Sequence, residues 1–268
     1  MKTGKKTTQG LMLAAVLAIL SGSFLPAFAA MSPKQYWEKG IGYAENKLYI
    51  DAVQNYTQAI RTNKGEIAIE DVARIFNSRG IAYQGLDELD KAIDDFSNAL
   101  EIDDKNPEFS MNRGLAFAYQ KKYDRARDDF SRAIALAPRS ADAYAGRGRA
   151  NQEAGSPDQA IADYRKVLEL DPRDIGARYG MGMAYKNNRQ DAEAIEVFND
   201  VLKIEPRYAA ASYQNAGLFS RAGKIDAACV WLDEAVTNGY RDWDTLKNDA
   251  DFDAIRKNSC YRRVLEGK

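Results

Sequence analysis

The chain has 268 residues, with 38 Lys and Arg against 39 Asp and Glu, and 45% of its residues are hydrophobic. This composition supplies a packed core, and a formal net charge of −1 offers no basic field to hold nucleic acid. Histidine is absent and only two cysteines exist, which excludes His-dependent catalysis, His-ligated metals and cysteine-only metal clusters.

Residues 1–29 have the three parts of a secretory signal peptide. A lysine-rich start precedes an unbroken apolar run from Leu11 to Leu20, and Ala27 and Ala29 form a small-x-small cleavage site. Cleavage after about Ala29 predicts a periplasmic or secreted protein with no further membrane insertion. If the leader were retained, it would act as an inner-membrane anchor.

The rest of the chain repeats with a period of 34 residues. A small residue in the first half of each unit is followed sixteen places later by a large apolar one, and small residues stand between and after them. The small column is Gly40, Gly80, Gly114, Gly148, Gly182 and Ala216. The large column is Tyr56, Phe96, Phe130, Tyr164, Phe198 and Leu232. Each unit therefore predicts two amphipathic helices whose backbones approach closely around one large side chain.

Helix boundaries are also signalled in the sequence. Ser32 and Gln35 form a capping box around Pro33, and Asn106 and Ser156 each precede a proline at an expected helix start. Prolines that cannot continue a helix end three of the units, at Pro138, Pro172 and Pro206.

Period and columns together resemble the tetratricopeptide repeat family over residues 33–240. The resemblance implies an all-α, right-handed superhelical solenoid of about six helix-turn-helix repeats. The predicted units are 33–66, 73–106, 107–140, 141–174, 175–208 and 209–240, with an insertion at 67–72. Residues 241–268 are not a further copy, and we expect a helical C-terminal capping segment there, because a terminal unit exposes its core side.

In that family the first helices line a concave face that binds an extended peptide or a partner helix. The matching places here give the candidate partner-binding residues Trp37, Asn77, Gln84, Met111, Arg149, Gln152, Tyr179, Met183, Lys186 and Tyr213. The alternative is that these side chains pack between neighbouring first helices, and for Ile41, Ile81 and Leu115 we expect such core packing. The family's clamp for a C-terminal carboxylate is not expected, because Trp37 and Ile41 stand where it uses Lys and Asn.

Five glycines crowd the first helices of two neighbouring units, and each costs about 1 kcal/mol relative to alanine. We expect close helix–helix contact to compensate; the alternative is a ligand backbone lying against bare helix. These are Gly146, Gly148, Gly176, Gly180 and Gly182.

The acidic pairs Asp94-Asp95 and Asp128-Asp129 lack the spacing of a calcium loop, so we expect solvated helix faces and no metal site. Cys229 stands where other units place an isoleucine that faces the next element, and that element carries Cys260. An oxidising compartment favours a disulfide between them, and two buried free thiols are the alternative.

These features predict a non-catalytic protein–protein interaction scaffold of the bacterial cell envelope, with a protein or peptide partner and no cofactor. The acidic residues occupy surface places that the repeat dictates, and the sequence offers no domain outside the repeats, so we do not expect an enzyme. The alternative function is a membrane-tethered or self-assembling organiser of an envelope complex, and the sequence allows a homo-oligomer.

Overall fold

The computed structural model describes residues 31–266, and every regular element in that range is helical. The expected leader, residues 1–29, lies outside the described residues. The longer helices are α2 (Pro33–Glu45), α3 (Tyr49–Thr62), α4 (Ile69–Gly85), α5 (Leu89–Ile102), α6 (Pro107–Tyr119), α7 (Tyr123–Leu136), α8 (Ala141–Glu153), α9 (Pro157–Leu170), α10 (Ile175–Asn187), α11 (Asp191–Ile204), α12 (Ala209–Arg221) and α13 (Ile225–Thr237). Three short elements follow, α14 (Trp243–Asn248), the 3-10 helix η1 (Ala250–Phe252) and α15 (Ser259–Glu266).

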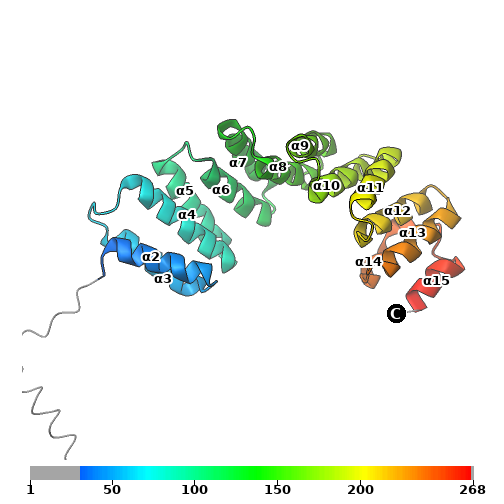
Figure 1. Cartoon of the computed structure of the whole chain (residues 1–268), viewed down its shortest axis with the longest axis horizontal. Helices are drawn as coiled ribbons and strands as arrows, with labels where there is room; N and C mark the ends of the chain where they lie inside the picture. The colour runs from blue at the N-terminus through cyan, green and yellow to red at the C-terminus, as the bar shows by residue number, and fades with distance from the viewer. Residues whose placement is uncertain (1–30, 267–268) are drawn as a thin grey trace, which may run out of the picture.

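The helices form consecutive hairpins that follow one another in a curved row (Figure 1). Helix α2 packs on α3, α4 on α5, and so on to α12 on α13, and each second helix also contacts the first helix of the next pair. Each hairpin thereby covers apolar surface that its neighbour cannot bury alone. The all-α solenoid expected from the sequence is confirmed. No helix within residues 31–266 is long and apolar enough to cross a membrane.

Two of the three expected capping signals are present. The Gln35 backbone N–H donates to Ser32 Oγ at 3.2 Å while the Ser32 N–H donates to the Gln35 side chain at 2.8 Å, which completes the capping box. Asn106 accepts from the Glu108 N–H at 3.0 Å. The expectation for Ser156 is wrong, because its backbone (φ −114°, ψ 66°) is not extended and its hydroxyl caps no N–H.

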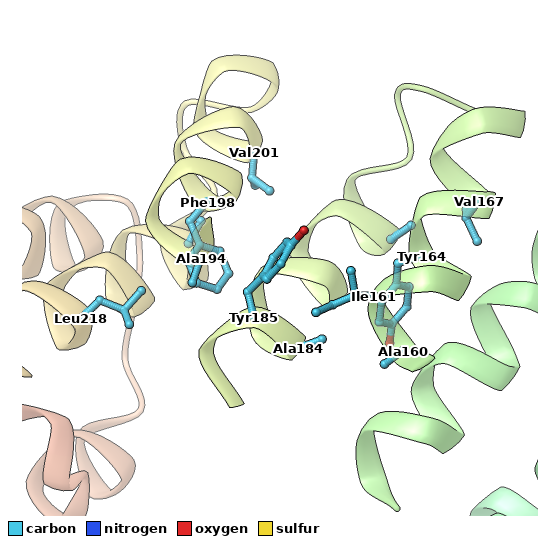
Figure 2. Close-up of a cluster of buried hydrophobic side chains, with 12 residues drawn as sticks. Ala160, Ile161, Tyr164, Val167, Ala184, Tyr185, Ala194, Phe198, Val201 and Leu218 are labelled. Atoms are coloured by element: carbon cyan, nitrogen blue, oxygen red, sulfur yellow. The ribbon is translucent and has the colours of Figure 1, made fainter. Parts of the chain in front are cut away.

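The space beside each of the repeated glycines is occupied by one of the repeated aromatic rings. A Cβ added to Gly182 would lie 2.7 Å from the Phe198 ring of the same pair, and one added to Gly180 would lie 2.7 Å from the Tyr164 ring of the preceding pair. Figure 2 shows Tyr164, Tyr185 and Phe198 among small side chains between successive helices. Gly146 and Gly148 follow the same rule, so close helix packing accounts for four of the five crowded glycines, and Gly176 meets only its N-cap Asp174.

We expect Gly182→Ala to lower the free energy of unfolding by about 1–3 kcal/mol, because the added methyl group forces the buried Phe198 ring to move. Gly42 is a matched control, since it is helical and nothing lies within 4 Å of its added Cβ. Gly42→Ala should raise the stability by up to about 1 kcal/mol. Urea unfolding followed by circular dichroism measures both changes, and a shift of the same sign in both would contradict the packing role.

An arginine–aspartate ladder runs through three consecutive pairs. In each pair an arginine of the first helix donates from two of its nitrogens to an aspartate 16 residues later on the second helix, and its third nitrogen donates to a hydroxyl of the preceding second helix. The members are Arg79, Asp95 and Thr57; Arg113, Asp129 and Ser97; and Arg147, Asp163 and Ser131.

The ladder corrects the expectation of solvated acidic faces. Asp95 and Asp129 are only 3% and 5% exposed, whereas their neighbours Asp94 and Asp128 face solvent. One sequence pattern indicates these pairs: an arginine stands 16 residues before each buried aspartate, and the arrangement recurs with the 34-residue period. These carboxylates are buried because each has a guanidinium partner.

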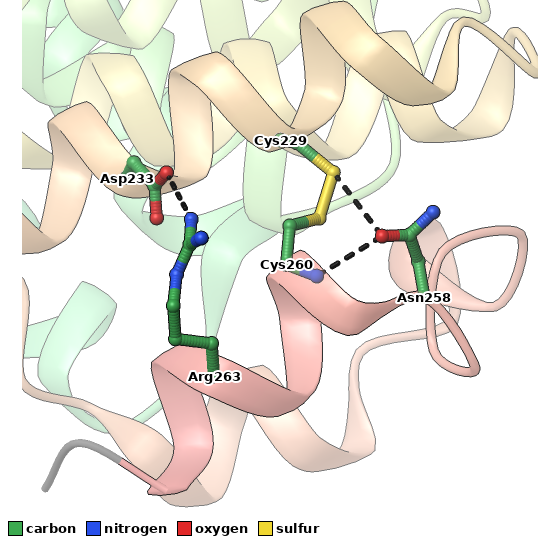
Figure 3. Close-up of a disulfide and its surroundings, with 5 residues drawn as sticks. All are labelled: Cys229, Asp233, Asn258, Cys260 and Arg263. Carbon is green, nitrogen blue, oxygen red and sulfur yellow. Dashed lines mark hydrogen bonds and ion pairs between the residues drawn. A yellow bond between two sulfur atoms is a disulfide. The ribbon is translucent and has the colours of Figure 1, made fainter.

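The C-terminal segment closes the last pair, as expected of a cap. Leu246, Phe252 and Ile255 are fully buried against α12 and α13. A disulfide joins Cys229 of α13 to Cys260 of α15, and an ion pair 2.7 Å long joins the same two helices nearby (Figure 3). The segment is therefore fixed to α13 both covalently and by burial.

Candidate partner-binding groove

The first helices of the pairs lie on the inner side of the curve. Helices α2, α4, α6, α8 and α10 contact one another in succession, more extensively than the second helices do. In a curved row, the elements that approach most closely lie on the concave side. We call the solvent-facing side of these helices, together with α12, the inner face.

Three apolar side chains at equivalent places of the repeat are exposed on the inner face, one each on α2, α4 and α6. Ile41 is 38% exposed, Ile81 42% and Leu115 36%. The expectation that they form core is wrong, because each first helix packs its glycine side on the rings of second helices and leaves this side open. The sequence repeat shows that these residues are equivalent but does not show which side of the helix stays free.

Two of the predicted groove residues in the N-terminal half, Trp37 and Asn77, are partly or wholly engaged in packing. Trp37 is half-buried against the first core cluster, and its indole N–H has no partner. Asn77 is buried, donates to Glu108 at 3.0 Å and accepts from Asn112 at 2.9 Å. Asn77 thus links α4 to α6.

The remaining half-buried candidates lie between helices. Met111 and Met183 pack against the cores of their units, and Gln84 and Gln152 are half-buried. Tyr179 contacts the rings of Phe198 and Tyr208 at centroid distances of 5.5 and 5.4 Å. Burial raises the pKa of the Tyr179 hydroxyl. The ring of Tyr179 therefore packs between helices, which is the alternative to its role in an open groove.

Arg149 is exposed and lies at an apolar pocket between α6, α7 and α8. The cavity has a volume of about 220 Å³ and is lined by Leu115, Ala118, Tyr119, Tyr123, Phe130, Gly146, Arg149, Ala150 and Glu153. Tyr119 at this site is 71% exposed. Within residues 31–266, Arg149 forms no ion pair or hydrogen bond with another side chain. The pocket thus combines an apolar floor with one unpaired cation.

The C-terminal end of the inner face is covered by the chain itself. Tyr213 is 4% exposed, donates to Asp249 at 2.7 Å and stacks on Tyr240 with centroids 4.2 Å apart. Burial raises the pKa of Tyr213 and of Tyr240, the latter to about 12. Tyr213, predicted as a groove residue, is therefore held under the capping segment.

Lys186 is engaged in the same way. Its ammonium group lies 2.7 Å from Asp251 and 2.6 Å from the Gln214 side-chain oxygen. Arg221 also pairs with Asp251, at 3.3 Å. The structure thus leaves the inner face open from α2 to α8 and fills it at α12. Nothing in the sequence repeat could have shown this, because the capping segment lies outside the repeat.

Residues 31–266 contain no cluster of three or more carboxylate or cysteine side chains placed to hold a metal ion.

Comparisons with known proteins agree with this geometry. Models of the tetratricopeptide repeat match residues 73–106, 111–175 and 151–206. A tetratricopeptide repeat protein from Parabacteroides merdae has a TM-score of 0.71 at 18% identity, over 87% of this chain and 88% of that one. No curated protein matches the sequence.

Two further solved structures share the fold over about two thirds of this chain. MamA has a TM-score of 0.59 at 24% identity and covers 66% of this chain and 94% of its own. YrrB, described as a protein with an unusual peptide-binding site, has a TM-score of 0.57 at 24% identity and covers 69% of this chain and 92% of its own. At these identities the likeness concerns the fold.

Proposed function

Because this chain is a tetratricopeptide-repeat protein, we propose that it is a non-catalytic scaffold that binds a peptide or partner protein along its inner face. The observation that carries the proposal is the row of exposed apolar side chains Ile41, Ile81 and Leu115, which leads to the pocket beside Arg149. Apolar side chains grouped on a concave surface are typical of a recognition site. The peptide-binding site described for YrrB supports the same use of this fold.

We place this scaffold in the bacterial cell envelope. The leader-like pattern of residues 1–29 favours export, and the Cys229–Cys260 disulfide suits an oxidising compartment. Edman sequencing of the protein purified from envelope fractions tests export directly. A start near Ala30 would support it, and a retained Met1 would favour the membrane-tethered organiser instead.

We expect Ile81→Ser combined with Leu115→Ser to reduce partner capture about tenfold or more, because two exposed apolar contacts are lost from the inner face. The measurement is affinity capture from an envelope extract with residues 30–268 as bait, followed by crosslink mapping. The matched control is Ile50→Ser combined with Val230→Ser, since these side chains are 62% and 65% exposed on second helices.

The control pair should capture as much partner as the unaltered protein, and all four substitutions should leave the melting temperature nearly unchanged. Crosslinks confined to the second helices, or an equal loss of capture in the control pair, would contradict binding at the inner face.

A further inference from the structure

The chain shows on its own inner face how an acidic and aromatic segment is held there. The Asp251 carboxylate lies between Lys186 and Arg221, at 2.7 and 3.3 Å. The next residue, Phe252, is fully buried with its ring 5.1 Å from that of Tyr213. A carboxylate on inner-face cations beside an aromatic ring in an apolar niche is therefore an arrangement that this surface accepts.

The pocket beside Arg149 offers the same two ingredients without an occupant from the described chain. Arg149 is exposed and forms no ion pair within residues 31–266, and Leu115, Phe130 and Ala150 line the cavity next to it. Glu153 is the acidic residue among those that line the pocket, and it is not paired with Arg149. The position of Arg149 is marked in the sequence as well, because equivalent places in the preceding units hold Ile41, Ile81 and Leu115.

The size of the pocket selects a single side chain. Its volume of about 220 Å³ is smaller than the roughly 300–1,000 Å³ of sites that enclose a whole small molecule. The exposed Ile81 and Ile41 continue the apolar surface along the inner face, so the rest of a bound segment has further contacts outside the pocket. An extended peptide with one anchoring side chain fits this shape.

We propose that the pocket between α6 and α8 binds a segment of a partner protein in which an aromatic side chain lies next to a carboxylate, with the ring in the pocket and the carboxylate on Arg149. The proposal rests on the proposed scaffold function and names its ligand chemistry. The occupant is a different protein, because the chain's own acidic segment is buried at α12 and held by the disulfide. A guanidinium beside an apolar floor binds a carboxylate through directed, charge-assisted hydrogen bonds.

The test uses a fluorescent, end-blocked peptide with the sequence Asp-Ala-Asp-Phe-Asp-Ala, which is that of residues 249–254. We expect it to bind the disulfide-bonded protein in an anisotropy titration. Peptides with Asn for every Asp, or with Ala for Phe, should bind about tenfold more weakly. Equal binding of all three peptides, or no binding of the first, would overturn the proposal.

Variants of the protein locate the site. Arg149→Ala should weaken binding of the acidic peptide about tenfold and Arg149→Lys less, while Arg139→Ala, at an exposed turn, should change nothing. Leu115→Ala should weaken binding of the parent peptide and leave the Ala-for-Phe peptide unaffected. If Arg149→Ala and Arg139→Ala bind equally well, the pocket is not the site.

Capture from the envelope extract separates this proposal from the scaffold function. Partner capture by the unaltered protein that persists in Arg149→Glu would overturn the pocket assignment and leave the scaffold intact. Failure of the unaltered protein to capture any protein would count against the scaffold function itself.

Discussion

Replacing Arg113 with alanine is expected to lower the free energy of unfolding by about 3 kcal/mol or more. Arg113 neutralises Asp129 through two hydrogen bonds of 2.7 and 2.8 Å and also donates to Ser97 on the preceding second helix at 3.1 Å. Without the guanidinium, the Asp129 carboxylate is left buried and unpaired. Urea unfolding followed by circular dichroism measures the loss.

Two further variants make the result specific to the ladder. Arg132→Ala removes an exposed arginine that pairs with Asp104 at 3.2 Å, and it should cost less than about 1 kcal/mol. Arg113→Met combined with Asp129→Val should recover most of the loss, because no buried charge is left without a partner. If Arg113→Ala cost no more than Arg132→Ala, the ladder would have no special role in stability.

The chain already contains the apolar version of the ladder. In the pair α10 and α11 the equivalent places hold Met181 and Val197, and both pack against a core cluster. In the next pair the places hold Asn215 and Trp231, and Asn215 donates instead to Asn199 of the preceding second helix at 2.9 Å. The hairpin therefore accepts a matched apolar pair in place of the charged pair, whereas a single substitution leaves one charged partner unmatched.

The pH dependence of stability gives a second test of the ladder, at the pair of Arg79 and Asp95. Burial raises the pKa of Asp95 above its usual range, and Arg79 opposes that shift. In Arg79→Ala the opposition disappears, so folding should favour the protonated carboxyl group even more. A carboxyl group whose folded pKa is raised stabilises the fold below its unfolded pKa, and that contribution is lost as the pH rises through the folded pKa. The destabilisation by Arg79→Ala should therefore be smallest in acid and grow towards neutral pH.

The sequence was sufficient for the hairpin packing because each glycine and its ring recur at fixed spacing, as with Gly182 and Phe198. The sequence did not show which side chains stay exposed and which are covered where several helices or the capping segment meet. Leu115 was expected in the core because apolar residues on helices are usually buried, but in a curved row one side of each first helix stays open. Tyr213 was expected in an open groove, and only the path of the capping segment shows that it is covered.

Removing the disulfide is expected to lower the stability of the C-terminal end by about 3–4 kcal/mol, because the bridge joins residues 31 apart and restricts the unfolded segment. The double variant Cys229→Ser and Cys260→Ser avoids a lone reactive thiol. In a solenoid, stability is set by local contacts between neighbouring units, so the loss should concentrate in α13 to α15. Amide hydrogen exchange should rise in residues 225–266 and stay unchanged in α2 and α3.

The capping segment fills the inner face at α12, so the same variant also tests what that burial contributes. Phe252, Ile255 and Tyr261 stay buried against α12 and α13 without the bridge, and Asp251 still faces Lys186 and Arg221. These contacts should keep the segment docked for most of the time, with exchange that is faster than in the bridged protein yet slower than in an unfolded chain. Exchange as fast as that of an unfolded chain would mean that the disulfide alone holds the cap. An increase spread evenly over all helices would instead mean that the end of the solenoid governs the stability of the whole.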